Sequence, residues 1–184
     1  MKRMLTAVLM ASLAFFTLAG CGKKASDAAP KDYAQIIHDA RTDEDNEGML
    51  ILSSNGEGGY AAIDGTAAEM TADDIQAQAD NFSLPMLGLE AGDYDSFAAS
   101  VSIMNVRSYA VAIVKPAEGK TDAVQQALEN YVTGQQLAMQ NYLADQYEIA
   151  KAATVTTVPS GEVVLVCCAD ADTVLASIEE ALAA

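Results

Sequence analysis

The stretch Arg107–Pro116, RSYAVAIVKP, has a strong strand pattern. It is rich in residues that favour β-strands, namely Tyr109, Val111, Ile113 and Val114. Pro116 and Gly119 end the pattern, because neither residue supports a continuing strand. We therefore predict a strand here. We predict a second strand in the preceding segment SVSIMN (100–105).

Downstream of this strand, the pattern changes to that of a helix and then returns to strands. Thr121 begins the longest predicted helix, which reaches roughly to Asp145 and carries an apolar stripe that includes Tyr131 and Tyr142. The strands ATVTTV (153–158) and EVVLVCC (162–168) follow, joined by a tight Pro-Ser-Gly turn. Asp170 or Asp172 then caps a final helix. The C-terminal half thus reads β-α-β-β-α.

Upstream, the predicted elements are shorter. Residues 33–41 have the spacing of a short amphipathic helix, and an acidic loop, TDEDNE (42–47), follows it. MLILSS (49–54) and YAAIDG (60–65) flank the turn-rich NGEGG, which indicates a hairpin. Thr71 caps a helix that runs to about Asn81, and residues 92–98 are predicted to add a helical turn. The whole pattern predicts an α+β fold: a single domain with an antiparallel or mixed sheet and helices on one face.

The N-terminus has the features of a targeting segment. Lys2 and Arg3 precede an apolar run, residues 5–19, which is shorter than the roughly 20 residues of a membrane span and suits a secretory signal. The residues Leu-Ala-Gly-Cys that end at Cys21 resemble the bacterial lipoprotein box. This resemblance implies that Cys21 is the lipid attachment site, carrying a diacylglyceryl group after cleavage in front of it. The alternative is an ordinary secreted protein with a free or disulfide-bonded Cys21.

The predicted domain organisation follows from that segment. Residues 1–20 form a lipoprotein signal peptide, residues 21–32 the acylated cysteine with a flexible linker, and residues 33–184 a single α+β domain. Cleavage would remove two basic and no acidic residues, leaving 8 basic and 26 acidic residues and a formal charge of −18. Nucleic acid is excluded as a partner, because phosphate binding depends on clustered Lys and Arg.

The residues that could carry chemistry are few. Cys167 and Cys168 are adjacent, so they point to opposite faces of a strand and are predicted to be free, buried thiols. His38 is the single histidine and is predicted to be exposed on a helix. The acidic run from Asp43 resembles the opening of a calcium loop, but its twelfth position is Ser54. We therefore predict no catalytic, cofactor or metal site.

The C-terminal half carries a second resemblance. SIMNVRSYAVAIVKPAEG, the Gln-rich helix ending NYLADQYEIAKAATV, and GEVVLVCCADADTVLASIEEAL are similar to a family of small lipoproteins of anaerobic Gram-positive bacteria. The similarity covers about residues 85–184. It implies a cell-surface location, and the shared domain of that family has no known function.

Together these observations predict a protein of the cell membrane, held by the lipid on Cys21 and facing outside the cytoplasm. Its partners would be the membrane, through the diacylglyceryl group, and an envelope protein or small ligand. Tyr147 and its neighbouring glutamines offer one surface for a peptide or sugar. We expect a non-enzymatic binding protein; the alternative is an envelope hydrolase with a carboxylate-based active site.

Overall fold

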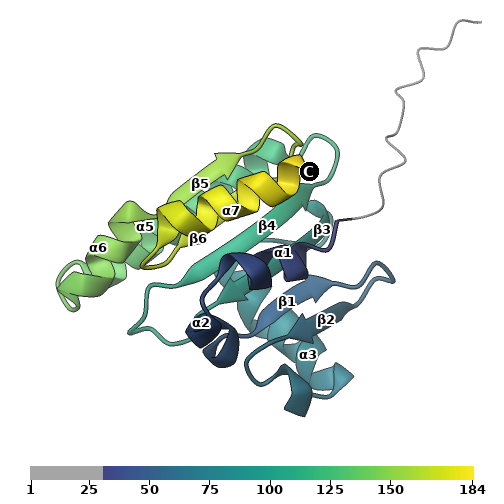
Figure 1. Cartoon of the computed structure of the whole chain (residues 1–184), viewed down its shortest axis with the longest axis horizontal. Helices are drawn as coiled ribbons and strands as arrows, with labels where there is room; N and C mark the ends of the chain where they lie inside the picture. Colours follow the sequence, from purple (N-terminus) through teal and green to yellow (C-terminus); the bar gives the residue numbers. More distant parts are fainter. Residues whose placement is uncertain (1–30) are drawn as a thin grey trace, which may run out of the picture. The chain divides into compact units, whose positions relative to one another are not determined.

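The computed structural model describes residues 31–184, which belong to one unit, Lys31–Ala184. The predicted signal peptide, Cys21 and nearly all of the predicted linker lie outside the described residues. Within this unit, six strands form one sheet in the order β2-β1-β3-β4-β6-β5, and every neighbouring pair is antiparallel. The unit is therefore a single α+β domain, as predicted (Figure 1).

The elements have the following bounds. The strands are β1 (Ile51–Ser54), β2 (Tyr60–Ile63), β3 (Tyr94–Val101), β4 (Ala110–Pro116), β5 (Thr154–Thr157) and β6 (Val163–Cys167). The helices are α1 (Tyr33–Ala40), α2 (Asp43–Gly48), η1 (Ala67–Glu69), α3 (Ala72–Gln78), η2 (Ala79–Ser83), α4 (Leu84–Leu87), α5 (Thr121–Met139), α6 (Ala144–Ala152) and α7 (Ala171–Ala183).

Strand β4 lies at the centre of the sheet and is buried on both faces. Its first five residues are all buried, and they alternate between two hydrophobic cores: Val111 and Ile113 belong to one, Ala112 and Val114 to the other. Strand β6 follows the same rule over its whole length. A strand with apolar residues at successive positions needs cover on each side, because every second side chain points to the opposite face.

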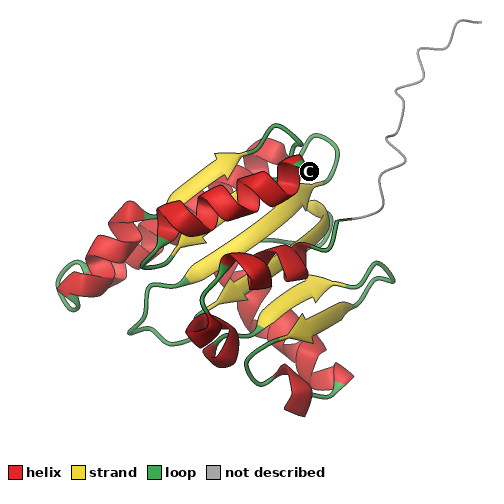
Figure 2. Ribbon diagram, in the orientation of Figure 1, coloured by secondary structure: helices red, strands yellow, loops and turns green. Residues whose placement is uncertain are grey.

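Helices provide that cover on both faces (Figure 2). Helices α1 and α7 contribute Ile37, Val174 and Ile178 to the core that contains Val111. The other core is covered by η2, α4 and α5, whose buried residues include Leu87 and Leu128. The predicted placement of all helices on one face is therefore wrong. The order of the helices along the chain does not determine which face of the sheet each helix covers.

The strand before β4 begins earlier than predicted. Residues 92–98 were predicted as a helical turn, whereas β3 starts at Tyr94 and pairs with β4 from Tyr94–Pro116 to Val101–Ala110. Its last five residues are all buried, so their pattern has no alternation to mark a strand. The predicted strand 100–105 extends too far toward the C-terminus, because β3 ends at Val101 and the residues after it form a loop. The acidic residues 42–47, predicted as a loop, lie mostly in α2, with Thr42 as its N-cap.

The longest predicted helix ends earlier than predicted, and a further helix that was not predicted follows it. α5 ends at Met139 and α6 begins at Ala144, so the apolar stripe ends at the turn between them. Tyr131 is buried as predicted, and its hydroxyl donates a hydrogen bond to the Tyr109 carbonyl oxygen. Tyr142 lies in the turn and is 72% exposed, so its predicted packing on the sheet is wrong. Within residues 31–184, none of the helices combines the length and hydropathy that crossing a bilayer requires.

Both predicted hairpins are present. β1 and β2 are joined by residues 55–59, where the Asn55 side-chain oxygen accepts hydrogen bonds from the amides of Glu57 and Gly59. After β2, the chain turns sharply back over the start of β1. Asp64 and Gly65 have positive φ angles of 64° and 47°, and a Cβ atom added to Gly65 would lie 2.8 Å from the Leu50 nitrogen. Only glycine allows this close backbone approach.

Replacing Gly65 with alanine should therefore destabilise the domain. We expect Gly65→Ala to lower the free energy of unfolding by about 1–3 kcal/mol, through left-handed strain and the backbone clash. Gly134→Ala is the matched control, because Gly134 lies inside α5 with no heavy atom within 4 Å of its added Cβ. That substitution should raise the same quantity by about 0.5–1 kcal/mol. Denaturant unfolding of both variants measures the difference, and effects of the same sign would contradict this account of the turn.

Candidate functional site

An apolar groove lies where the loop between β3 and β4 meets the α2–β1 junction, the residues on either side of η1 and the last residue of α3. Its volume is about 430 Å³. The lining side chains are apolar or uncharged: Met49, Leu50, Thr66, Met70, Gln78, Val101, Ser102, Ile103 and Met104, with Gly48. A volume of this size is in the range of ligand-binding clefts, and we take the groove as the candidate functional site.

The β3–β4 loop presents unusually exposed apolar side chains at this groove. Ile103 and Met104, which line the groove, are 57% and 55% exposed, and Val106, further along the loop, is 46% exposed. Exposed apolar side chains that adjoin a groove indicate a site of interaction more often than scattered ones do. Sequence reasoning missed these residues, because it placed Ile103 and Met104 in a strand. The signal that could have found them is an apolar run that extends beyond the end of its paired strand.

The loop is held in one conformation by its own hydrogen bonds. The Ser102 amide donates to the Tyr109 carbonyl at 3.0 Å and closes the base of the loop. Nearer the tip, the Met104 amide donates to the Ser102 hydroxyl oxygen at 3.2 Å, and the Arg107 amide donates to the Met104 carbonyl. The apolar side chains therefore project from an ordered turn.

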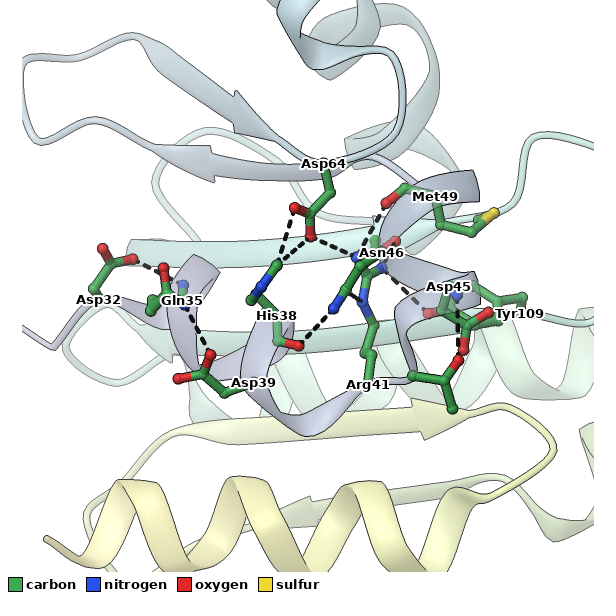
Figure 3. A network of polar contacts seen from close by, with 12 residues as sticks. Asp32, Gln35, His38, Asp39, Arg41, Asp45, Asn46, Met49, Asp64 and Tyr109 are labelled. Carbon is green, nitrogen blue, oxygen red and sulfur yellow. Dashed lines mark hydrogen bonds and ion pairs between the residues drawn. The ribbon is translucent and has the colours of Figure 1, made fainter.

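The wall of the groove formed by Met49 is fixed by a buried arginine. The Arg41 guanidinium, fully buried at the end of α1, donates hydrogen bonds to five acceptors (Figure 3). These are the Met49 carbonyl, the Asp64 carboxylate and the side-chain oxygens of Asn46, Ser100 and Tyr109, at 2.7 to 3.2 Å. A buried charge needs such complete pairing, and this network joins the α1–α2 segment to β3, β4 and the turn after β2.

His38 is part of the same network, which corrects the prediction that it is an exposed residue. Its Nδ1 lies 2.9 Å from the nearer carboxylate oxygen of Asp64, and its side chain is 38% exposed (Figure 3). Asp64 is therefore shared between His38 and Arg41. No local pattern could have shown this pairing, because 26 residues separate His38 from Asp64.

The acidic run after Arg41 contributes an ion pair. Asp45 accepts a hydrogen bond from Arg107 at 2.8 Å, and the Arg107 guanidinium lies over the Tyr109 ring, 4.8 Å from its centroid. Burial raises the pKa of Tyr109 to about 12, even though Arg41 beside it acts in the opposite direction. The Tyr109 hydroxyl is therefore neutral at physiological pH and contributes hydrogen bonds to the network.

The two adjacent cysteines are free and buried, as predicted. Cys167 packs in the core that contains Leu128, and Cys168 packs in the core that contains Ile178, so the thiols point to opposite faces of the sheet. Burial raises the pKa of Cys167 to about 12 and that of Cys168 to about 11. Both groups are protonated at neutral pH, and thiol chemistry requires the thiolate.

The remaining predicted positions have local roles. Asp170 is at the N-cap position of α7 and Asp172 is in its first turn, although the Asp170 side chain makes no capping hydrogen bond. Tyr147 on α6 is partly buried, and the Lys151 amino group lies 5.5 Å from its ring centroid. Among residues 31–184, no three His, Cys, Asp or Glu side chains are grouped as metal ligands would be.

The comparison with protein families gives the class of this chain. Residues 67–169 match the family described as "Domain of unknown function (DUF4358)". The match covers more than half of the sequence, and the chain belongs to this family. The matched region runs from η1 to β6 and includes the β3–β4 loop, while β1 and β2 lie before it. No curated protein and no solved structure matched the chain when each set was searched.

The buried network makes a prediction for stability. Arg41→Met should lower the free energy of unfolding by about 3–5 kcal/mol, because it leaves the carboxylate of Asp64 and the hydroxyls of Ser100 and Tyr109 without their shared donor. Lys151→Met is the control, since Lys151 pairs with Glu148 on the surface and both side chains are about half exposed or more. It should change stability by less than about 0.5 kcal/mol. Urea unfolding followed by far-UV circular dichroism compares the two, and equal effects would show that the network is dispensable.

Proposed function

We propose that the protein is an extracytoplasmic lipoprotein, attached to the cell membrane through Cys21, and that its folded domain binds a partner without catalysing a reaction. The anchor is supported by the order of the N-terminal features: basic residues, an apolar run of signal length, and Leu-Ala-Gly before Cys21. Two acyl chains hold a protein stably at a bilayer, where a single chain does so only marginally.

The binding role is carried by one observation, the apolar groove with the exposed side chains of Ile103 and Met104 at its edge. Contact of these apolar side chains with water is unfavourable. A partner that covers them would remove this contact, and the free energy gained would favour binding. An envelope hydrolase would use two carboxylates about a cleft, and the groove is lined by uncharged side chains. The groove thus supports a binding protein in preference to the hydrolase.

The anchor predicts where acyl groups are found. In bacterial cells that express the full chain and are grown with an alkyne-tagged palmitate, the wild-type protein should carry the tag and fractionate with membranes. Cys21→Ser should lose both properties, because the thiol is the attachment point. Cys168→Ala should retain both, since that thiol is buried in the domain. Tagging that survives Cys21→Ser would place the acyl group elsewhere and overturn the anchor.

The binding role predicts where a partner is contacted. A photoreactive amino acid at position 104 of the full chain should give a discrete cross-linked product on intact cells. The same amino acid at position 137 should not, although Leu137 is just as exposed, at 63%, because it lies on α5 and lines no part of the groove. Equal cross-linking at both positions would mean that the groove is not the contact surface.

A further inference from the structure

The charge around the groove identifies the kind of partner that it fits. Between Arg41 and Arg107 the sequence contains no Lys, Arg or His, while it contains thirteen acidic residues. This stretch includes α2, β1, β2, α3 and β3, and it supplies every residue that lines the groove. The two arginines that bound it are themselves paired internally, Arg41 with Asp64 and Arg107 with Asp45.

Several of these acidic residues are next to lining residues in the sequence or belong to the same elements. Glu47 precedes Gly48 in α2, and Glu69 precedes Met70 after η1; both glutamates are exposed, and neither side chain has a hydrogen-bond partner among the described residues. Asp43 and Glu44 on α2, and Asp73 in the first turn of α3, are also exposed. The groove therefore combines an apolar lining with exposed carboxylates on neighbouring residues.

We propose that the groove binds a basic amphipathic segment of a partner protein, whose apolar face enters the groove and whose Lys and Arg side chains meet the surrounding carboxylates. This inference rests on the proposed function and names its partner class. The neighbouring carboxylates would attract a cationic segment, which raises its association rate and orients it toward the groove. An apolar segment with acidic flanks would be repelled.

The methionines in the groove lining can accommodate apolar side chains of different shapes. Met49, Met70 and Met104 contribute to its lining, and methionine is unbranched, flexible and polarizable, so it adapts to apolar groups of different form. The exposed apolar side chains of the loop are not confined to the groove lining, because Val106, which does not line the groove, is also exposed; a helix or extended segment could cover it together with Ile103, and a small molecule could not. Because the β3–β4 loop is ordered by its own hydrogen bonds, binding would cost little conformational entropy in this loop.

The same charges argue against the membrane surface as the occupant. Bacterial and other anionic bilayers attract basic patches, and the acidic residues beside this groove would oppose their approach. A second copy of the chain would bring the same exposed carboxylates against themselves, so self-association by this face is disfavoured in the same way.

The test uses the full chain, with nanodiscs of zwitterionic lipid present so that an acylated N-terminus has a bilayer. The probe is a fluorescein-labelled amphipathic Leu/Lys peptide of about five helical turns, and its neutral Leu/Gln and acidic Leu/Glu counterparts are the matched peptides. Fluorescence anisotropy at low salt should give saturable binding of the Leu/Lys peptide, with the other two bound at least about tenfold more weakly. Raising the salt concentration should weaken the Leu/Lys complex.

Two pairs of variants separate the contributions. Glu47→Gln with Glu69→Gln should weaken Leu/Lys binding by about three- to tenfold, whereas Glu179→Gln with Glu180→Gln on the exposed side of α7 should leave it unchanged. Ile103→Ser with Met104→Ser should weaken it by about tenfold or more, while Leu137→Ser should not. These side chains are exposed, so folding should persist in all variants, and thermal unfolding verifies it.

The outcomes distinguish this inference from the proposed function. Equal binding of all three peptides that is lost only with the Ile103/Met104 variant would overturn the basic partner and leave a groove that binds apolar segments. Binding of the Leu/Lys peptide that responds equally to the α7 pair would show a general charge effect and also overturn it. Binding that is insensitive to every groove variant would overturn both. Insertion of a fluorophore at position 104 into the nanodiscs, or dimerisation lost with Met104→Ser, would instead assign the groove to lipid or to a second copy.

Discussion

The burial of β4 and β6 on both faces is the constraint on which the rest of this structure depends. Apolar side chains at every position of a strand cannot be hidden by a single layer, because successive residues point to opposite faces of the sheet. The chain meets this requirement by placing α1 and α7 on one face and α4 and α5 on the other. Two separate cores result, and the adjacent thiols of Cys167 and Cys168 are divided between them. Inert cysteines are thus a consequence of the strand geometry.

The two arginines that border the acidic half of the domain have structural partners. Arg41 joins the α1–α2 segment to the sheet through five hydrogen bonds, and Arg107 joins the β3–β4 loop to α2 through Asp45. Both networks contact residues of the groove. The Arg41 guanidinium donates a hydrogen bond to the Met49 carbonyl, and the Arg107 amide donates one to the Met104 carbonyl. Their positive charge is consequently paired with Asp64 and Asp45 and does not compensate the exposed Glu47 and Glu69. The same pairings therefore support the groove and leave these two carboxylates without a cationic partner among the described residues.

The functional conclusions rest on two independent parts of the chain. The proposed anchor depends on the short N-terminal pattern that ends at Cys21 and is independent of the folded domain that follows it. The binding role depends on the β3–β4 loop, which lies inside the region shared with its family of unknown function. Either can fail experimentally without the other. The proposed docking surface is difficult to recognise in the sequence, because such a surface requires neither a nucleophile nor a metal ligand.

Local sequence determined much of the secondary structure. The hairpins around residues 55–59 and 159–161, the strand β4 and the cap at Thr71 follow from turn residues, β-branched side chains and capping chemistry, all of which act over a few residues. Tertiary structure alone decided the faces that the helices cover, the start of β3, the break after Met139 and the pairing of His38 with Asp64. Arg41 meets Ser100 across 59 residues of sequence, and the groove joins α2, α3 and the β3–β4 loop. Such contacts are set by packing between distant segments, and no short-range pattern contains them.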